Sequence, residues 1–576
     1  MKMFLRFFKQ YPKESVLAPL FKLLEACFDL LVPLVVAAII DDGISGDGGK
    51  SLVFRMVIVL VILAFVGLAC AVAAQYFAAK AAVGGAARLR HDLFVHIQSF
   101  TYAQTDKVGT STLMTRLTSD INQLQSGVNM TLRLLLRSPI IVFGAAILAF
   151  TVDTRLALIF IITIPVLAAV VFAIMLGGIP LYKKVQGRLD RVTGATRENL
   201  NGVRVIRAFC KEGEEVEKFN RINREQTAYQ NKAGYLSSAM NPLTYIIINL
   251  ATVILLQQGA FRMQIPGSDL TQGEMVALIN YMAQILIELV KLANTVFLVT
   301  KAMACGNRVQ AVLDMPAGHE FTADTATKEG SAVSFEHVSM SYHKGGEPSL
   351  RDVHFSVSPG QTVGIIGGTG SGKSTLVNLI PRFYDATEGR VTVLGRDVRS
   401  YRPDELRALI GVVPQKAVLF KGTIRDNLLW GKADASDLEL WQALSTAQAA
   451  DFVKEKDGQL DAPVAQRGKN FSGGQKQRLT VARALVGEKP ILILDDSASA
   501  LDFATEAHLR KALQTLPHRP TTFIVSQRTA SVRFADLIIV LDNGEVCGMG
   551  RHDDLMASCQ VYREIYESQF KGGEGA

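Results

Sequence analysis

A short glycine-rich run in the second half of the chain has the composition of a loop that binds phosphate. Residues Gly367–Thr375 read G-G-T-G-S-G-K-S-T and follow directly on the apolar run Thr362–Ile366. Glycines let successive N–H groups point at phosphate oxygens, Lys373 adds a positive charge there, and the Ser374 hydroxyl can ligate Mg²⁺. A chance glycine-rich turn is the weaker interpretation, because a strand precedes the loop and the Lys-Ser pair is in place. The predicted nucleotide-binding residues are Gly367, Gly368, Thr369, Gly370, Ser371, Gly372, Lys373, Ser374 and Thr375.

Two further polar residues follow apolar runs and could share a metal with this loop. The run Ile491–Asp495 ends in a carboxylate, and Gln415 comes just after the apolar pair Val412–Val413 and a proline. A carboxylate at the end of a buried strand can hold Mg²⁺ through water, and Gln415 could reach the same ion. The sequence therefore predicts a Mg²⁺ site made by Ser374, Gln415 and Asp495.

A second glycine-containing motif precedes a basic helical run. Residues Phe471–Gln475 read F-S-G-G-Q, and Lys476, Arg478 and Arg483 follow them. Serine and glycine N–H groups at the start of a helix form an anion site. The candidate anion-binding residues are Ser472, Gly473, Gly474 and Gln475.

Strand-like and helical runs alternate around these motifs, which is typical of an α/β domain with a largely parallel sheet. The predicted strands are Val333–Phe335, Gln361–Ile366, Leu409–Val413, Ile491–Leu494, Thr522–Val525 and Leu537–Leu541.

The first 300 or so residues have a different composition, with six apolar stretches long enough to span a bilayer, which takes about 20 residues of helix. The predicted spans are Ser15–Ile40, Leu52–Ala79, Leu132–Phe150, Leu156–Gly178, Pro242–Phe261 and Met275–Val299. Short links would join them on one side of the membrane, and the long basic segments Lys80–Thr131 and Leu181–Met240 would project on the other. Because positive loops favour the cytoplasm, both termini and the α/β domain are predicted to be cytoplasmic in a multi-pass inner (plasma) membrane protein.

Charge and cysteine content limit the other classes of partner. The net charge is +8, which fits a cytoplasmic surface facing lipid, and no nucleic-acid motif accompanies it, so no nucleic-acid partner is predicted. The six cysteines form no C-x-x-C pair, which indicates reduced structural thiols instead of a disulfide frame or a zinc site. We predict a transmembrane domain over residues 1–313, a polar linker over 314–331 and a nucleotide-binding domain over 332–576.

Taken in order, these motifs resemble those of an ATP-binding cassette (ABC) exporter half-transporter. Gly367–Thr375 resembles the family's Walker A motif, Phe471–Gln475 its signature motif and Ile491–Asp495 its Walker B motif. Gln415 is similar to the Q-loop glutamine and Ser499–Asp502 to the D-loop. The resemblance covers essentially the whole chain and implies ATP and Mg²⁺ as cofactors.

The resemblance also implies a dimer and two further contacts. Tyr342 resembles the aromatic residue that stacks on adenine, although a lone strand tyrosine is also common as packing. In the family, each ATP site combines one chain's Walker motifs with the signature of a second half-transporter chain, so the signature would act in trans. Thr101–Thr112 and Glu198–Phe209 fall where the family has coupling helices; ordinary solvated helix surface is the alternative.

Two residues depart from the family pattern at the predicted catalytic positions. Asp496 stands where a glutamate is expected after the Walker B aspartate, and Gln527 stands where a histidine is expected. An aspartate carboxylate should fall more than about 1 Å short of the attacking water, and a misplacement of that size can cost about 10²-fold in rate. Glutamine cannot carry the proton's charge that histidine can. The chain's own site is thus expected to bind ATP well and to hydrolyse it poorly.

The two altered positions together with the intact signature indicate a heterodimer whose partner supplies the catalytic glutamate and histidine, an asymmetry that resembles that of bacterial heterodimeric multidrug exporters. The expected function is ATP-driven export of amphipathic drugs or lipid-like compounds by alternating access. Alternatives are a homodimer with slow hydrolysis, a homodimeric lipid flippase, and an ATP-gated channel or regulatory subunit.

Charged residues inside predicted spans are candidates for function, because charge is costly within a membrane. Glu25 and Asp29 could face the bundle interior and attract cationic drugs, or lie near a wet mouth. Glu288 and Lys291 are spaced to pair with each other, either as structure or as cavity lining. Four aromatic residues could line an apolar cavity, although most such residues face lipid or other helices. They are Phe28, Phe65, Phe143 and Phe297.

Overall fold

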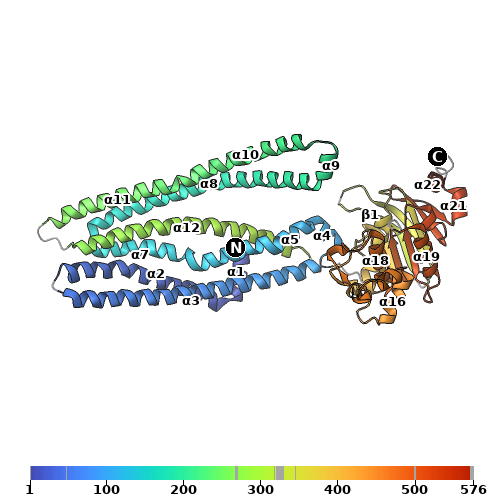
Figure 1. The fold of residues 1–576 in the computed structure, drawn as a ribbon, viewed down its shortest axis with the longest axis horizontal. Coiled ribbons are helices and arrows are strands. Elements are labelled where there is room, and N and C mark those ends of the chain that lie inside the picture. The colour runs from blue at the N-terminus through green and yellow to red at the C-terminus, as the bar shows by residue number, and fades with distance from the viewer. Residues whose placement is uncertain are drawn as a thin grey trace. The chain divides into compact units, whose positions relative to one another are not determined.

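A computed structural model describes residues 2–46, 48–265, 270–316, 318, 330–343, 345–497 and 501–570. The chain divides into two compact units, each described here by itself (Figure 1). The membrane unit comprises Met1–Gln98 and Thr110–Pro316, and the nucleotide unit comprises Ser99–Gly109 and Ala317–Ala576. Most of the predicted linker, 314–331, lies outside the described residues.

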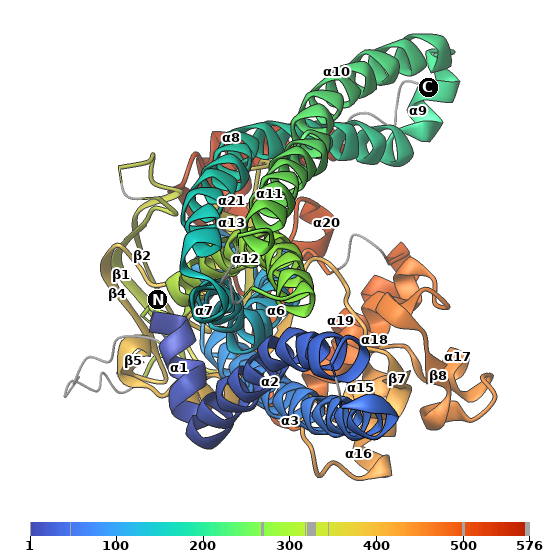
Figure 2. The same ribbon diagram turned by 90° about the vertical axis from the view of Figure 1, so that its left-hand side faces the viewer.

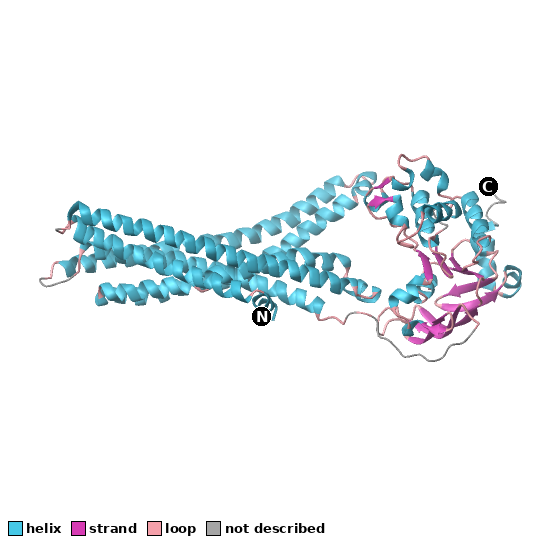
Figure 3. Ribbon diagram, turned by 90° about the horizontal axis from the view of Figure 1, so that it is seen from below, coloured by secondary structure: helices cyan, strands magenta, loops and turns pink. Residues whose placement is uncertain are grey.

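The membrane unit is built from helices alone in its described part (Figure 3). Within the described residues, six helical segments are long and apolar enough to cross a membrane, and each predicted span lies inside one of them: Pro12–Ile44, Gly49–Gln98, Thr110–Val152, Thr154–Asn201, Glu212–Met263 and Gln272–Leu313. The prediction of a six-helix membrane domain is confirmed. The α-helices are α1 (Lys2–Gln10), α2 (Pro12–Ala38), α3 (Gly49–Gln98), α5 (Thr110–Thr115), α6 (Ile121–Met130), α7 (Arg137–Val152), α8 (Thr154–Asn201), α9 (Val203–Ala208), α10 (Glu212–Ser238), α11 (Met240–Met263) and α12 (Gln272–Leu313).

Helix α12 lies among α2, α7, α8 and α11 at the centre of this unit (Figure 2). Its apolar side chains Leu278, Met282 and Ile285 are fully buried, as expected of a helix that packs on several sides. Tyr281 is also buried, and its hydroxyl donates to the Leu30 carbonyl on α2 at 2.8 Å, which satisfies its polar atom. These contacts fix α2 against α12.

Three π-helical turns interrupt the regular helices: η1 (Ile39–Ile44), η2 (Arg116–Asp120) and η3 (Thr131–Leu135). The sequence analysis did not predict them. Such turns are rare and often lie at functional sites. The turn η3 lies just before α7, with Leu136 alone between the turn and Arg137.

The nucleotide unit contains two main sheets. The six-stranded sheet has the order β12-β11-β3-β10-β9-β6, in which only the β11–β12 pairing is antiparallel. The predicted largely parallel sheet is thus confirmed. A separate antiparallel sheet has the order β2-β1-β4-β5. The strands are β1 (Val333–Met340), β2 (Leu350–Val357), β3 (Thr362–Gly367), β4 (Glu388–Val393), β5 (Arg396–Asp397), β6 (Ile410–Val413), β7 (Gly422–Thr423), β8 (Pro463–Val464), β9 (Ile491–Asp495), β10 (Thr521–Val525), β11 (Leu537–Asp542) and β12 (Glu545–Gly550).

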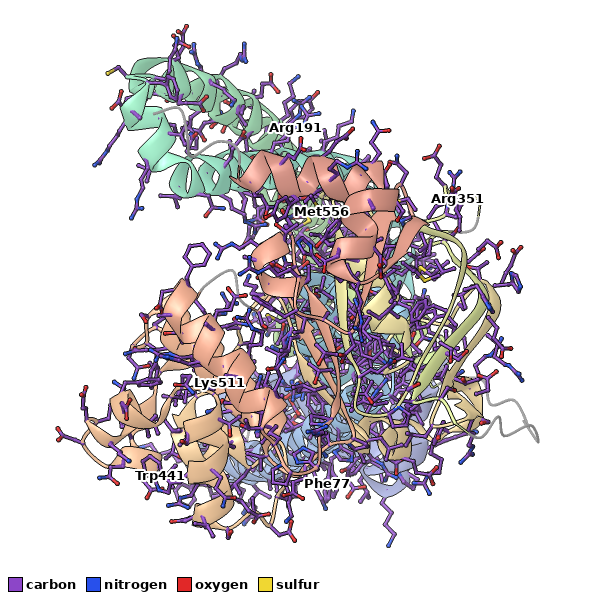
Figure 4. All side chains as sticks on the ribbon, turned by 90° about the vertical axis from the view of Figure 1, so that its right-hand side faces the viewer. Phe77, Arg191, Arg351, Trp441, Lys511 and Met556 are labelled. Atoms are coloured by element: carbon purple, nitrogen blue, oxygen red, sulfur yellow. The ribbon has the colours of Figure 1, made fainter. Side chains whose placement is uncertain are left out.

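Helices cover the parallel sheet, and several of them, including α16 and α18, pack together in a group of helices. In Figure 4, Trp441 of α16 and Lys511 of α19 lie on the same side of the nucleotide unit. The helices are α4 (Tyr102–Val108), α13 (Lys373–Leu379), α14 (Pro403–Ala408), α15 (Ile424–Leu428), α16 (Asp437–Thr446), α17 (Ala450–Lys454), α18 (Gly473–Leu485), α19 (Phe503–Gln514), α20 (Thr529–Val532), α21 (His552–Ser558) and α22 (Gln560–Phe570), with short 3₁₀ turns η4 (Val398–Ser400), η5 (Gln459–Asp461) and η6 (Gln466–Gly468).

Helix α4 packs within the nucleotide unit, although it follows α3 in the chain. The Tyr102 ring stacks on Phe383 with centroids 4.4 Å apart, and the Tyr384 hydroxyl donates to the Asp106 carboxylate. Burial, reinforced by Asp106, raises the pKa of Tyr384. The first candidate coupling segment, Thr101–Thr112, therefore contains a helix that packs within the nucleotide unit. The second, Glu198–Phe209, contains α9, whose neighbour Phe209 is exposed.

Candidate functional site

The glycine-rich loop joins β3 to α13, as the sequence analysis predicted. Gly370 and Gly372 have φ values of 83° and 97°, in the left-handed region that favours glycine. A Cβ atom on Gly372 would lie 2.6 Å from the Ser349 carbonyl oxygen, so the turn also needs a residue without a side chain. The loop borders a cavity of about 350 Å³. This cavity is lined by Tyr342, Ser349, Thr369, Gly370, Ser371, Gly372, Lys373, Ser374, Thr375, Gln415, Asp495, Asp496, Val525, Ser526 and Gln527.

Lys373 is a buried cation at the base of this cavity, only 9% exposed. Its ammonium donates to the carbonyl oxygens of Gly367 at 2.9 Å and Gly368 at 2.5 Å. Burial lowers the pKa of Lys373, whereas the nearby carboxylates of Asp496 and Asp495 raise it. The Lys373 side chain is thus tethered to the carbonyl oxygens of its own loop at the border of the cavity.

Two of the three residues predicted to hold Mg²⁺, Ser374 and Asp495, are in direct contact, whereas the third, Gln415, hydrogen-bonds to Asp496. The Ser374 hydroxyl donates to Asp495 Oδ1 at 3.0 Å. Burial raises the pKa of Asp495, against the hydrogen bond from Ser374 that lowers it. A hydroxyl and a carboxylate are hard oxygen ligands of the kind Mg²⁺ prefers alongside substrate phosphates, so the residues fit the ion. Bound Mg²⁺ would neutralise charge on the phosphate oxygens, and these two side chains would hold it.

Asp496 lies next to this pair in a constrained conformation. Its φ is 45°, and its N–H donates to the Val525 carbonyl at 3.0 Å, which fixes the backbone where β9 ends beside β10. The Gln415 amide donates to Asp496 Oδ2 at 3.3 Å, a long hydrogen bond. The structure therefore brings Gln415 and Asp496 together at the cavity.

Gln527 lines the same cavity just past the end of β10. Its backbone carbonyl accepts a hydrogen bond from the Gln569 amide of α22 at 2.7 Å, which holds this segment. Both departures from the family pattern, Asp496 and Gln527, consequently lie at one cavity. Ser526, Ser349 and Val525 also line it and were not predicted. Ser526 could have been predicted, because it directly follows the apolar run of β10. No sequence pattern marks Ser349 as a cavity residue.

Tyr342 lies at the rim of the cavity and is 45% exposed. Its hydroxyl is 2.9 Å from Thr375 Oγ1, and its ring meets that of Tyr384 edge to face, with centroids 5.1 Å apart. The ring is thus partly exposed at the cavity, and an aromatic ring in such a place can stack on a planar group. This position is compatible with the adenine-stacking role that the resemblance implied.

The signature residues lie at the start of α18, apart from this cavity. Ser472 caps the helix: its hydroxyl accepts from the Gln475 N–H at 3.3 Å, and Gln475 Oε1 accepts from the Ser472 N–H at 3.1 Å. A Cβ on Gly473 would meet no described atom within 4 Å, so the backbone here is open. None of Ser472, Gly473, Gly474 and Gln475 lines the cavity. In the D-loop stretch, Ser499 lies outside the described residues and Asp502 caps α19.

Replacing Lys373 with alanine is expected to lower the affinity of this chain's own site for ATP by at least about tenfold, because the variant loses a charged hydrogen-bond donor to phosphate. Equilibrium binding of a fluorescent ATP analogue to the purified chain measures the effect. Lys432→Ala is the matched control, since Lys432 pairs with Glu439 on the surface of the same unit at 2.7 Å. Equal affinities of the Lys373 variant and the control would contradict the assignment of the loop.

Comparisons with known proteins agree with this geometry. Family models for the ABC transporter transmembrane region and for the ABC transporter match residues 15–289 and 350–499. The chain is 35% identical over 572 residues to the uncharacterized ABC transporter ATP-binding protein YfiB of Bacillus subtilis (strain 168), with 99% of each covered. Two other relatives are YgaD of the same organism, a multidrug export ATP-binding/permease protein by provisional name (32% over 589 residues, 99% and 98% covered), and ATP-dependent lipid A-core flippase 1 of Colwellia psychrerythraea (strain 34H / ATCC BAA-681) (29% over 578 residues, 98% and 95% covered).

A solved bacterial Atm1-family ABC exporter with ATP bound has the same fold, with a TM-score of 0.80, 23% identity, and coverage of 98% of this chain and 99% of that one. The chain thus joins the two regions that the two family models describe, in the order found in a solved exporter of the same fold. The chain belongs to the ABC transporter family, as an exporter half-transporter that joins one transmembrane domain to one ATP-binding domain.

Proposed function

We propose that this chain is one subunit of a heterodimeric ATP-driven exporter in the inner membrane, with its nucleotide unit in the cytoplasm. Its own site binds ATP and Mg²⁺ but hydrolyses ATP slowly, and its signature completes the active site of a different partner chain. The observation that carries the proposal is the side chain at the catalytic position, Asp496, which is short and lies within hydrogen-bond distance of Gln415.

The position of Asp496 limits what it can do as a base. A general base must come within about 2.6–3.2 Å of the water it activates. The Asp496 backbone N–H is hydrogen-bonded to the Val525 carbonyl. This bond opposes a movement of the strand end that would make up for the shorter side chain of aspartate. Gln527, at the position of the expected histidine, supplies an amide that carries no charge. Binding residues are retained while both residues of the hydrolytic step are altered.

The signature supports the other half of the proposal. Ser472 caps a helix of 13 residues that begins at Gly473, where an added Cβ would meet nothing within 4 Å. An open helix start of this kind suits an anion from outside the chain. A subunit that could not contribute to any hydrolytic site would not need this motif. In the proposed heterodimer, the site that hydrolyses ATP therefore lies between this signature and the Walker motifs of the partner.

The proposed cargo is an amphipathic drug or a lipid-like compound. Relatives carry names that refer to multidrug export and to lipid A-core flipping. The name of the lipid A-core flippase favours lipid flipping as the alternative function, which we would place in a homodimer of this chain. Translocation of a fluorescent lipid between leaflets tests it. An ATP-gated channel or regulatory subunit is a further alternative, suggested by the altered Asp496 and Gln527.

Inverted membrane vesicles that contain this chain and its partner are expected to accumulate an amphipathic dye above the external concentration when ATP is added. An exporter couples hydrolysis to uphill movement, whereas a gated channel only equilibrates the dye. A non-hydrolysable ATP analogue is the control and should support binding without accumulation. ATP-dependent entry that stops at equal concentrations on both sides would instead identify a channel.

A further inference from the structure

Six charged side chains of the membrane unit form one network across α2, α7 and α12. They are Lys22, Glu25, Asp29, Arg137, Glu288 and Lys291. Their formal charges cancel, because three are acidic and three are basic. The predicted pair of Glu288 with Lys291 is present at 3.0 Å, but the centre of the network is Arg137, which the sequence analysis did not single out.

The core of the network is a buried ion pair. Arg137 Nη1 donates to Glu288 Oε1 at 2.6 Å, and the Ser138 hydroxyl donates to Glu288 Oε2 at 2.8 Å. Glu288 is only 3% exposed. Lys22 compensates Glu25 at 2.5 Å, so Glu25 is not left to attract a cationic compound as one of the expectations had it. Removing one partner of such a buried pair strongly destabilises a protein, so we expect the Arg137–Glu288 core of the network to stay in place.

Two members lie at the edge of this core and have opposite charge. The side chains of Asp29 and Lys291 are 44% and 45% exposed. Asp29 binds Arg137 Nη2 at 2.7 Å, and Lys291 binds the Glu288 oxygen that Arg137 already holds. Either side chain could therefore turn to another partner while the Arg137–Glu288 pair stays intact.

The network lies well inside the membrane unit. Arg137 is about 23 Å along α7 from the end at Val152, and Glu288 is a similar distance along α12 from its start at Gln272. The hydrocarbon core of a bilayer is about 30 Å thick, so this level is in the half away from the short loops. Charged side chains at such a depth generally face the bundle interior or a water-filled cavity, because lipid tails cannot solvate them.

Unused polar atoms beside the network could also take part in binding. Gln284 lies one helical turn before Glu288 on α12, and its Oε1 is buried with no hydrogen-bond partner among the described residues. Arg137 Nε likewise makes no hydrogen bond, and lies 3.8 Å from Glu25 Oε1. Arg133, one turn before Arg137, contacts Asn129 at 3.5 Å and no member of the network in the described contacts. Buried polar atoms without partners are costly unless something else satisfies them.

We infer that Asp29 and Lys291 form a binding site for the headgroup of a zwitterionic amphiphile, with the cationic part at Asp29 and the anionic part at Lys291. Because the network is neutral, a purely cationic or purely anionic headgroup would leave a net charge at low dielectric, whereas a zwitterion would not. This inference rests on the proposed export function and narrows its cargo.

Three fluorescent amphiphiles with the same acyl chain and different headgroups test the inference: phosphocholine, quaternary ammonium and phosphate monoester. Their equilibrium binding to the full-length chain in detergent micelles is measured without ATP. The wild type is expected to bind the phosphocholine compound about fivefold more tightly than either singly charged one. Asp29→Asn should weaken binding of the ammonium compound and strengthen that of the phosphate compound, and Lys291→Gln should do the reverse.

The charge-preserving variants Asp29→Glu and Lys291→Arg are the controls and should keep the wild-type order of headgroups. Shifts of opposite sign in the two neutral variants support the site. Equal losses for all three amphiphiles in both variants, or no preference in the wild type, would overturn it in favour of a purely structural network. Failure of the proposed export would be seen separately, as headgroup-selective binding without ATP-dependent accumulation in vesicles.

Discussion

The double substitution Asp496→Glu with Gln527→His is expected to raise ATP hydrolysis at this chain's own site by about 10²-fold. The longer carboxylate would recover the reach that a general base needs, and histidine would restore a side chain able to carry a proton. Both positions already line the cavity that contains Lys373 and Asp495, so neither substitution has to create a new site. The rate is measured in the assembly with the partner's own site inactivated.

Two single variants act as controls for this gain. Asp496→Asn should stay at or below the wild-type rate, because an amide is not a base. Gln527→His alone should give only a small increase, since the carboxylate would still be short. No gain from the double substitution would contradict the assignment of slow hydrolysis to these two residues and would indicate that another contact, such as the partner's signature, limits this site.

Ser472→Ala is expected to lower hydrolysis at the partner's site by about 10²-fold while leaving ATP binding at this chain's own cavity unchanged. The size follows from losing one preorganised donor to the transferring phosphoryl group. Ser472 does not line the local cavity, so a local effect on binding has no structural basis. The measurement is single-turnover hydrolysis by the assembled complex, together with nucleotide binding to the purified chain.

The structure offers a matched control for the loss of the helix cap. Ser436 caps α16 by the same reciprocal bonds, with Glu439 in place of Gln475. Removing either cap should cost about 1 kcal/mol of unfolding free energy. Ser436→Ala should therefore reproduce the stability loss and leave hydrolysis intact. If Ser436→Ala slowed hydrolysis as much as Ser472→Ala, the signature would have only a structural role.

Much of the fold was predictable, because its signals are local and periodic. The apolar runs predict the six spanning segments, and β3, β9 and β10 are nearly continuous apolar strands of the kind that a covered parallel sheet requires. The antiparallel sheet around β1 was not predicted. In β2, buried and exposed positions largely alternate, which is the pattern of a strand with one solvated face and differs from the apolar runs that predict the other strands.

Other features depend on contacts between residues far apart in the chain, so sequence spacing could not indicate them. Glu288 and Lys291 are three residues apart and were expected to pair, whereas Arg137 reaches Glu288 across 151 positions. The bond from Gln415 to Asp496 joins the ends of β6 and β9, which are neighbours only in the folded sheet.

The most direct test of the account is the ATPase rate of this chain purified alone in lipid nanodiscs, compared with the rate after the partner chain is added. We predict negligible turnover by the chain alone and a large increase with the partner, of which Ser472→Ala in this chain would remove most. Robust turnover by the chain alone that Lys373→Ala abolishes would contradict the account, because Asp496 would then be a competent base in a homodimer.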